Sequence, residues 1–142
     1  METEGFFAPE TASEAGDYYE AVGPVAQTTV REVAKAMDFD RTEYRERVTA
    51  DVVETARDAT FASLLEVTIG TRDEYETWRE TYDGEIHEAG HEAVDRVVWH
   101  VGPADEAVAA TFQNEPDAAV ATLRRQAFGR LYRPLFEDGE RR

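Results

Sequence analysis

Two histidines and a glutamate stand at a spacing that can bind zinc and use it. His87, Glu88 and His91 form the pattern H-E-x-x-H, within a stretch, residues 83–103, that holds all three histidines of the chain. On a helix the two histidines would lie one turn apart and both reach a zinc ion, while Glu88 would act as general base toward the metal-bound water. The pattern therefore raises the hypothesis of a zinc-dependent hydrolase or peptidase.

The residues around this pattern argue against a helix. Gly90 and the valine-rich run 94–101 favour strand or turn over residues 85–93, which removes the one-turn spacing. Val94 and Val97 stand where the longer metzincin pattern has glycine and histidine. A third zinc ligand would have to come from His100, Glu106 or Glu115. None of these residues lies at a diagnostic spacing from the pattern. We therefore predict no catalytic residue, no metal site and no cofactor, with Glu88, His87, His91 and zinc as the alternative.

Two further patterns have structural explanations. Asp38 and Asp40 match the phosphatase nucleophile signature D-x-D-x-T, but they follow a helical run and not a buried strand. We predict that Asp40 caps the next helix, with Glu43 at its third position. Strand alternation places His100 on the face opposite Trp99, and a lone histidine on a strand is more often a structural hydrogen-bonding group than a catalyst. Neither pattern indicates an active site.

Basic side chains are concentrated late in the chain, at Arg124, Arg125, Arg130, Arg133, Arg141 and Arg142. Basic residues late in a helix suit its negative end, and in an acidic protein they pair with Asp and Glu. We predict this role for them. The alternative is a docking face for an acidic partner or a phosphate group.

The charge balance indicates the surroundings of the protein. The chain has 31 acidic and 15 basic residues, a net charge of −16, and Lys35 is its single lysine. Such a surface repels itself and nucleic-acid phosphates, and about 1 M salt screens this repulsion because the Debye length falls to about 3 Å. We predict a protein of a salt-in halophile that does not bind nucleic acid. It has no cysteine, no signal-peptide pattern and no apolar run that could span a membrane, so we expect it in the cytoplasm.

Hydrophobic periodicity predicts one α+β domain over residues 1–142. We expect a loose lead-in over 1–10, a helical part over 11–60 that breaks at Gly23–Pro24, and a sheet with a C-terminal helix over 61–142. The alternating segments, each expected to be a strand, are 65–69, 97–101 and 108–112. They predict a small, mainly antiparallel sheet with a long helix, beginning at Pro116, packed on it. A short capped helix is expected between Thr71 and Asp83.

The helical part has two expected apolar faces. One is spread across the break at 23–24 and consists of Val22, Val25, Val30, Val33 and Met37. The other lies on a single helix that we expect to run from residue 41 to about residue 60, and consists of Tyr44, Val48, Val52, Ala56 and Ala59. Both faces are predicted to be buried.

Three runs of sequence resemble a known family. They are T-A-R-D-A-T-F-A-S-L-L-E-V (55–67), V-D-R-V-V-W-H (94–100) and T-L-R-R-Q-A-F-G-R-L-Y-R (122–133). They resemble a small haloarchaeal family of unknown function, and the resemblance covers most of the chain. It implies an archaeal source and no assigned activity. We therefore predict a non-catalytic cytoplasmic interaction or regulatory protein that acts through a protein partner or through self-association, with the zinc hydrolase as the alternative.

Overall fold

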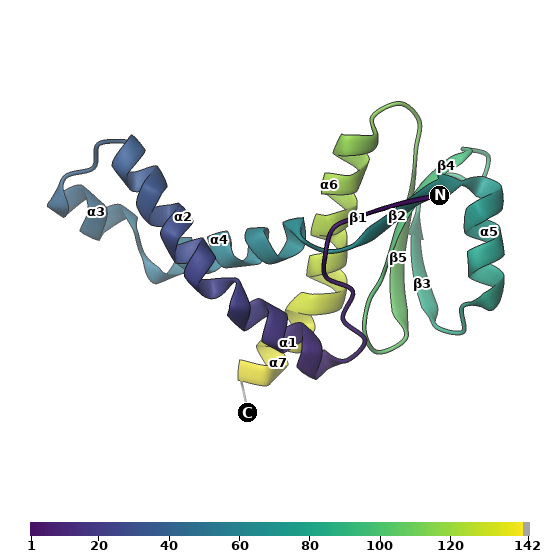
Figure 1. Cartoon of the computed structure of the whole chain (residues 1–142), viewed down its shortest axis with the longest axis horizontal. Helices are drawn as coiled ribbons and strands as arrows, with labels where there is room; N and C mark the ends of the chain where they lie inside the picture. The colour runs from purple at the N-terminus through teal and green to yellow at the C-terminus, as the bar shows by residue number, and fades with distance from the viewer. Residues whose placement is uncertain (141–142) are drawn as a thin grey trace.

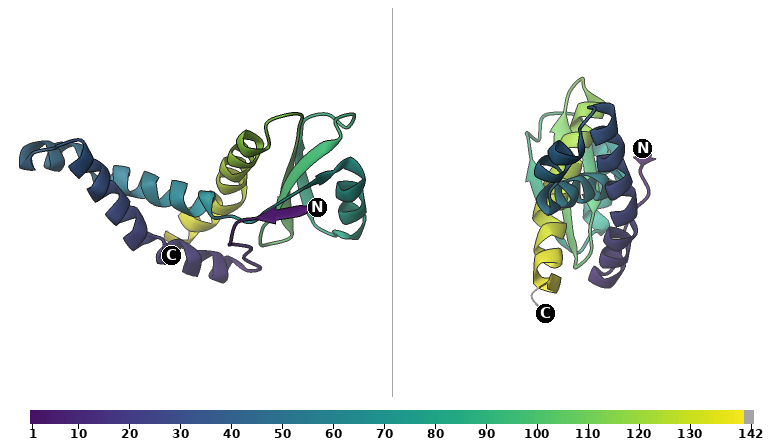
Figure 2. Two further views of the ribbon diagram at one scale, coloured as in Figure 1. Left: turned by 45° about the horizontal axis from the view of Figure 1, so that its top comes forward. Right: turned by 90° about the vertical axis from the view of Figure 1, so that its left-hand side faces the viewer.

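The chain folds into a sheet-based body from which a helical arm projects (Figures 1 and 2). The computed structural model describes residues 1–140, apart from the side chains of 138–140. The helices are α1 (Ala12–Ala21), α2 (Gly23–Ala36), α3 (Arg41–Arg47), α4 (Ala50–Ser63), α5 (Arg72–Thr81), α6 (Pro116–Ala127) and α7 (Arg133–Glu140). The arm consists of α2, α3 and α4. No helix among the described residues is long and apolar enough to cross a bilayer.

The body is built on a five-stranded sheet with the order β1-β2-β4-β5-β3. Its strands are β1 (Glu2–Glu4), β2 (Val67–Thr71), β3 (Glu85–Ala89), β4 (Arg96–Val101) and β5 (Glu106–Phe112). Neighbouring strands are antiparallel, except that β3 lies parallel to β5 at one edge. The predicted α+β class and the mainly antiparallel sheet are confirmed, and β4 and β5 form an antiparallel hairpin.

Helices cover both faces of this sheet and create two hydrophobic cores. On one face, Tyr75 of α5 packs against Val97 and Trp99 of β4. On the other face, Leu123 of α6 belongs to a larger core that includes Val98. Successive residues of β4 thus serve opposite cores, as the alternation of side chains along a strand requires.

The larger core joins the arm to the body. Phe61, near the end of α4, is completely buried, and its ring lies edge-on to Tyr132 and Phe136 at centroid distances of 5.2 and 5.4 Å. Tyr132 comes from a π-helical turn, Phe128–Tyr132, between α6 and α7. A π-turn adds a residue to the helical repeat and so changes the direction in which the following side chains point.

The caps predicted at Asp40 and Thr71 are confirmed, and Thr11 provides a third. The side chain of Thr11 accepts a hydrogen bond from the Glu14 amide at the start of α1. Asp40 at α3 and Thr71 at α5 each form a full capping box. These caps fix where α1, α3 and α5 begin. Asp40 is thus a helix cap, as predicted, and not a phosphatase nucleophile.

Two predicted boundaries are wrong. The expected loose lead-in contains β1, whose Glu2–Glu4 pair with Val67–Ile69 of β2. The single helix expected from 41 to about 60 is two helices, because Thr49 caps a new one by accepting a hydrogen bond from the Val52 amide at 3.3 Å. The cap lets the chain turn back at the tip of the arm, so that α4 runs alongside α2.

The predicted buried faces of the arm are also partly wrong. On α2 the residues that are buried are Ala26 and Ala34, one and three turns along the helix. Val25, Val33 and Met37 were expected to be inside but are exposed. The small alanines let α2 lie close to α4, and this leaves the larger side chains on the outside.

Candidate functional site

The H-E-x-x-H residues lie on a strand and the turn that follows it. His87 and Glu88 are neighbours on β3 and therefore point to opposite faces of the sheet. His91 lies beyond Gly90, whose φ of 104° suits glycine and ends the strand. The strand or turn predicted for this stretch is confirmed. A zinc hydrolase would need His87 and His91 one helical turn apart. The strand β3 and the turn after it do not place them so.

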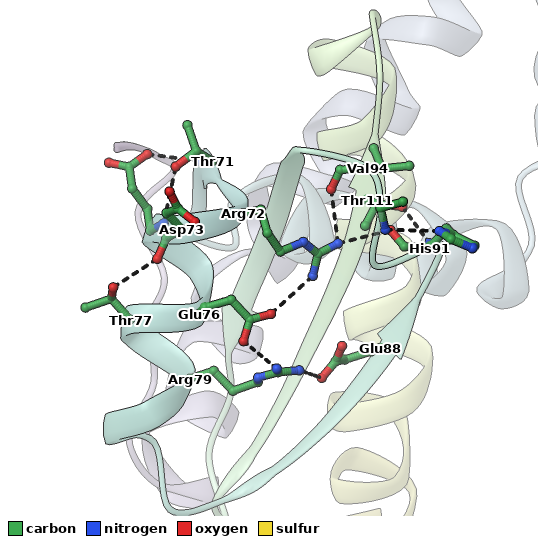
Figure 3. A network of polar contacts seen from close by, with 12 residues as sticks. Thr71, Arg72, Asp73, Glu76, Thr77, Arg79, Glu88, His91, Val94 and Thr111 are labelled. Carbon is green, nitrogen blue, oxygen red and sulfur yellow. Dashed lines mark hydrogen bonds and ion pairs between the residues drawn. The ribbon is translucent and has the colours of Figure 1, made fainter.

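The carboxylate of Glu88 takes part in a chain of ion pairs between α5 and β3 (Figure 3). Arg79 Nη1 donates to Glu88 Oε1 at 2.8 Å, and Arg79 also pairs with Glu76. The Oε1 atom of Glu76 lies 3.5 Å from Arg72 Nη1. Positive and negative groups alternate along this chain. Glu88 is therefore an ion-pair partner of α5, and not a free base beside a metal.

Arg72 holds the turn that contains His91. Its Nη2 donates to the carbonyl oxygens of His91 at 3.0 Å and Val94 at 3.1 Å, and the His91 ring points away from it (Figure 3). The His91 amide donates to Thr111 Oγ1 at 3.2 Å, and His91 Nδ1 accepts from the Ala93 amide at 3.0 Å. These bonds give His91 a structural role in the turn.

A cavity of about 60 Å³ lies beside this network, lined by Arg72, Tyr75 and Glu88 among others. Burial, together with the nearby Glu88 carboxylate, raises the pKa of Tyr75, so its hydroxyl remains protonated. Sites for small molecules usually measure about 300–1,000 Å³. The cavity is thus too small for a substrate, although it has room for water-sized molecules.

His87 lies in a different group of charged side chains on the opposite face of β3. Its Nε2 is 3.9 Å from Glu106 Oε1 and its Nδ1 is 4.0 Å from Glu85 Oε1. These three residues each offer a ligand atom within 4.8 Å of the others, the spacing of a possible metal site. Arg130 Nη1 also lies 3.3 Å from His87 Nδ1. The guanidinium engages the Nδ1 atom of His87 and offsets one of the two carboxylate charges, which disfavours a cation beside that atom.

His100 is buried between β2 and the π-turn. Its Nδ1 lies 2.5 Å from the Glu66 carbonyl oxygen and its Nε2 lies 2.6 Å from the Tyr132 hydroxyl. Only 1% of its surface is exposed. The structural role predicted for His100 agrees with these contacts. A substrate has no access to either ring nitrogen.

A groove of about 610 Å³ lies between α6 and the ends of β3 and β5. Its lining is mainly alanine, threonine and amide side chains, including Thr111, Thr122, Gln113 and Gln126. Glu115 is the single ionisable residue among those that line it. A nucleophile without an adjacent base is weakly reactive, so this groove has no catalytic set.

The C-terminal arginines contact groups other than the predicted carboxylates. Arg124 Nε donates to the Leu65 carbonyl at 2.9 Å, Arg130 contacts His87, and Arg133 lies over the Phe128 ring at 5.4 Å. Among the side chains of residues 1–137, no carboxylate lies within 4.0 Å of these guanidinium groups. Arg141 and Arg142 lie outside the described residues. The predicted Asp and Glu partners of Arg124, Arg130 and Arg133 are therefore wrong within this part of the chain.

The arm presents a set of exposed residues that the sequence had placed in the core. Val25, Val33, Met37 and Val52 have 55, 52, 59 and 42% of their surface exposed. Thr29 lies between Val25 and Val33 on the same row of α2 and is also exposed, and its hydroxyl donates to the Val25 carbonyl at 2.9 Å. We call these five residues the outer arm face.

The part of the arm that carries most of this face has no net charge. Residues 21–48 contain five basic and five acidic side chains, so the remainder of the chain carries the entire net charge of −16. Charge counted segment by segment could have revealed this surface from the sequence alone. Helical periodicity could not, because both the alanine row and the valine row of α2 recur at helical spacing.

The chain belongs to DUF5809, a family of unknown function, whose model matches residues 6–133. The expectation of a family without an assigned activity is therefore confirmed. Comparisons with curated proteins and with solved structures gave no match.

Proposed function

We propose that this protein is a non-catalytic interaction protein and that its helical arm docks another polypeptide. The observation that supports this most is the outer arm face, where four large apolar side chains are exposed, three of them on residues 21–48, a segment without net charge. Apolar surface gains about 25 cal/mol for each Å² removed from water, and contiguous exposed patches commonly mark interaction sites.

The position of this face favours a protein as the partner. The arm projects from the sheet (Figure 2), so a partner can approach it without meeting the acidic body closely. Nucleic acid would be repelled by the net charge of −16 and would find no basic surface in a neutral segment. A second polypeptide with an apolar, uncharged surface fits both properties.

We further propose that the protein works in the cytoplasm of a halophilic archaeon, as one domain. The excess of 31 acidic over 15 basic residues, with one lysine, supports this setting. Molar salt screens repulsion between acidic surfaces and strengthens apolar contacts, depending on the salt. A docking face that is apolar and neutral would therefore bind its partner in molar salt. A docking face that relied on exposed ion pairs would bind more weakly.

A photo-crosslinking amino acid placed at position 33 tests the proposed function. Position 101 provides a matched control, because Val101 is also an exposed valine, at 39%, but lies on β4 of the body. We expect irradiation in a high-salt lysate to give one main protein adduct from position 33, identifiable by mass spectrometry, and none from position 101. Equal adducts from both positions, or none from position 33, would contradict the proposal.

A further inference from the structure

We infer that the polypeptide docked by the outer arm face is a second copy of this chain, bound so that two α2–α4 hairpins form an antiparallel four-helix bundle. This inference rests on the proposed function and names its partner. It follows from the arrangement of the face, from its charge and from its size.

The row on α2 is self-complementary under a two-fold axis. Val25, Thr29 and Val33 of α2 and Met37 at its C-cap recur at steps of four residues, which places them on one broad side of the helix, each turned by about 40° from the one before. If two copies of α2 cross in an antiparallel direction near residue 31, Val25 meets the second copy's Met37, and Thr29 meets the second copy's Val33. Large side chains then lie opposite large ones and the small Thr29 opposite a valine, so both rows can pack in register.

Val52 of α4 extends this row into a two-helix face. A groove on the other side of the hairpin is lined by Gln27 and Arg31 of α2 and by Ala50 and Val53 of α4. At 100° per residue, Val25, Thr29 and Val33 lie on the other side of α2 from this groove, and Val52 lies on the corresponding side of α4. The apolar face therefore spans both helices, as a bundle of two hairpins requires.

Charge favours this contact over contacts between the acidic bodies of two copies. Residues 21–48 are neutral overall, whereas the rest of the chain carries −16, so most pairings of two copies would bring like charges together. Two arms that meet through their outer faces bring the neutral residues 21–48 of each copy together, and α4 contributes a net charge of only −2, from Asp51, Glu54 and Asp58 against Arg57. The acidic bodies then lie at opposite ends, because each arm projects away from its own sheet (Figure 1).

The size of the face indicates a weak dimer. A helix of 14 residues, the length of α2 and of α4, is about 21 Å long, and two helices side by side are about 20 Å wide. The footprint is then on the order of 400 Å² per copy, below the roughly 800 Å² per partner of a standard interface. We therefore expect a reversible dimer whose population rises with concentration.

Sedimentation equilibrium of the full chain in roughly 1 M KCl measures this directly. We expect the average mass to rise from one chain toward two with increasing concentration. Val33→Glu should weaken the dimer at least about tenfold, because it buries an unpaired carboxylate, and Val101→Glu should leave it unchanged. Circular dichroism checks that both variants are folded. A single-chain mass at every concentration, or a dimer unaffected by a folded Val33→Glu, would overturn the inference.

Engineered cysteines provide a second measurement, because the chain has none of its own. A mixture of Thr29→Cys and Val33→Cys chains should form a disulfide-linked dimer faster than either variant mixed with Val101→Cys. Equal rates, or a preference of Val33→Cys for itself, would overturn the antiparallel arrangement. If the chain stays monomeric while position 33 crosslinks to a different protein, the second-copy inference fails and the proposed function stands. If the chain neither dimerises nor crosslinks from position 33, the inference and the proposed function both fail.

Discussion

The Nε2 atom of His100 lies 2.6 Å from the hydroxyl oxygen of Tyr132, and neither residue is exposed by more than 1%. The other ring nitrogen, Nδ1, faces the Glu66 carbonyl at 2.5 Å. A carbonyl oxygen can only accept, so Nδ1 carries the proton of the neutral ring, and Nε2 accepts from Tyr132. This pair connects β4, the segment before β2 and the π-turn through one histidine.

Removal of the tyrosine hydroxyl should destabilise the fold. Tyr132→Phe keeps the buried ring but leaves Nε2 of His100 without a donor, which should cost about 1–3 kcal/mol in the free energy of unfolding. Tyr44→Phe is the matched control, since Tyr44 lies on the arm and is 37% exposed. Denaturant titrations of both variants at constant KCl measure the difference. Equal stability of the two variants would show that the His100–Tyr132 bond contributes nothing.

The same histidine should make stability depend on pH. Burial lowers the pKa of His100 from its ordinary 6.5 to about 4, with a smaller lowering by Arg124 and an opposing effect of the Glu66 carbonyl. Between these two values the unfolded chain binds a proton that the folded chain does not. Stability should therefore be fully present above pH 6.5 and fall as the pH drops to 4, by on the order of 3 kcal/mol.

Unfolding measured at a series of pH values tests this dependence. The comparison is with His100→Asn, which removes the titrating group, so that its curve should be flatter than that of the natural chain between pH 4 and 6.5. Carboxylates titrate mainly near the lower end of this range in both proteins, so their contribution cancels in the comparison. Parallel curves for the two proteins would exclude His100 as the cause.

The parts of the fold that could be predicted are those fixed by local chemistry. Asp40 and Thr71 form capping boxes because each has a glutamate three residues later, and that signal is in the sequence. Trp99 and His100 face opposite cores because alternation along a strand requires it. The structural role of His100 was predicted because a lone histidine on a strand seldom acts in catalysis, but its partner Tyr132 depends on a π-turn that periodicity does not reveal.

The parts that were missed depend on contacts between distant segments. The sequence Glu2–Glu4 has no apolar residue, and it becomes a strand only because β2 offers a free edge. On α2, two rows compete for the inside, and the alanines are buried because α4 lies close by. The candidate docking surface was missed for this reason. Its signal in the sequence is the neutral charge of 21–48 within an acidic chain.

Two glycines should respond to alanine in opposite ways. Gly90 has φ of 104°, and an added Cβ would lie 1.9 Å from Thr111 Oγ1, so Gly90→Ala should destabilise the turn by about 1–3 kcal/mol. Gly16 lies within α1, where an added Cβ meets nothing within 4 Å. Gly16→Ala should therefore stabilise the protein by about 0.5–1 kcal/mol. Thermal unfolding of both variants checks the signs, and a harmless Gly90→Ala would contradict the strained turn.

Dilution of salt should destabilise the protein. With a net charge of −16, self-repulsion increases as KCl falls from about 1 M to roughly 0.1 M, because the Debye length grows from about 3 to about 10 Å. We expect the melting temperature to decrease through this series. A temperature that stays constant or rises on dilution would argue against a protein adapted to high salt.

The purified protein should carry no stoichiometric zinc. Three features of the H-E-x-x-H stretch lead to this expectation: β3 gives His87 and His91 no helical spacing, Glu88 is paired with Arg79, and Arg130 contacts His87. His87→Ala and Glu88→Gln should change the free energy of unfolding by no more than about 1 kcal/mol, since both positions are partly exposed. Elemental analysis after purification without chelators provides the measurement. About one zinc per chain, lost in His87→Ala, would support the hydrolase. In that case Glu106→Gln and His91→Ala would show whether the metal uses the strand cluster or the sequence motif.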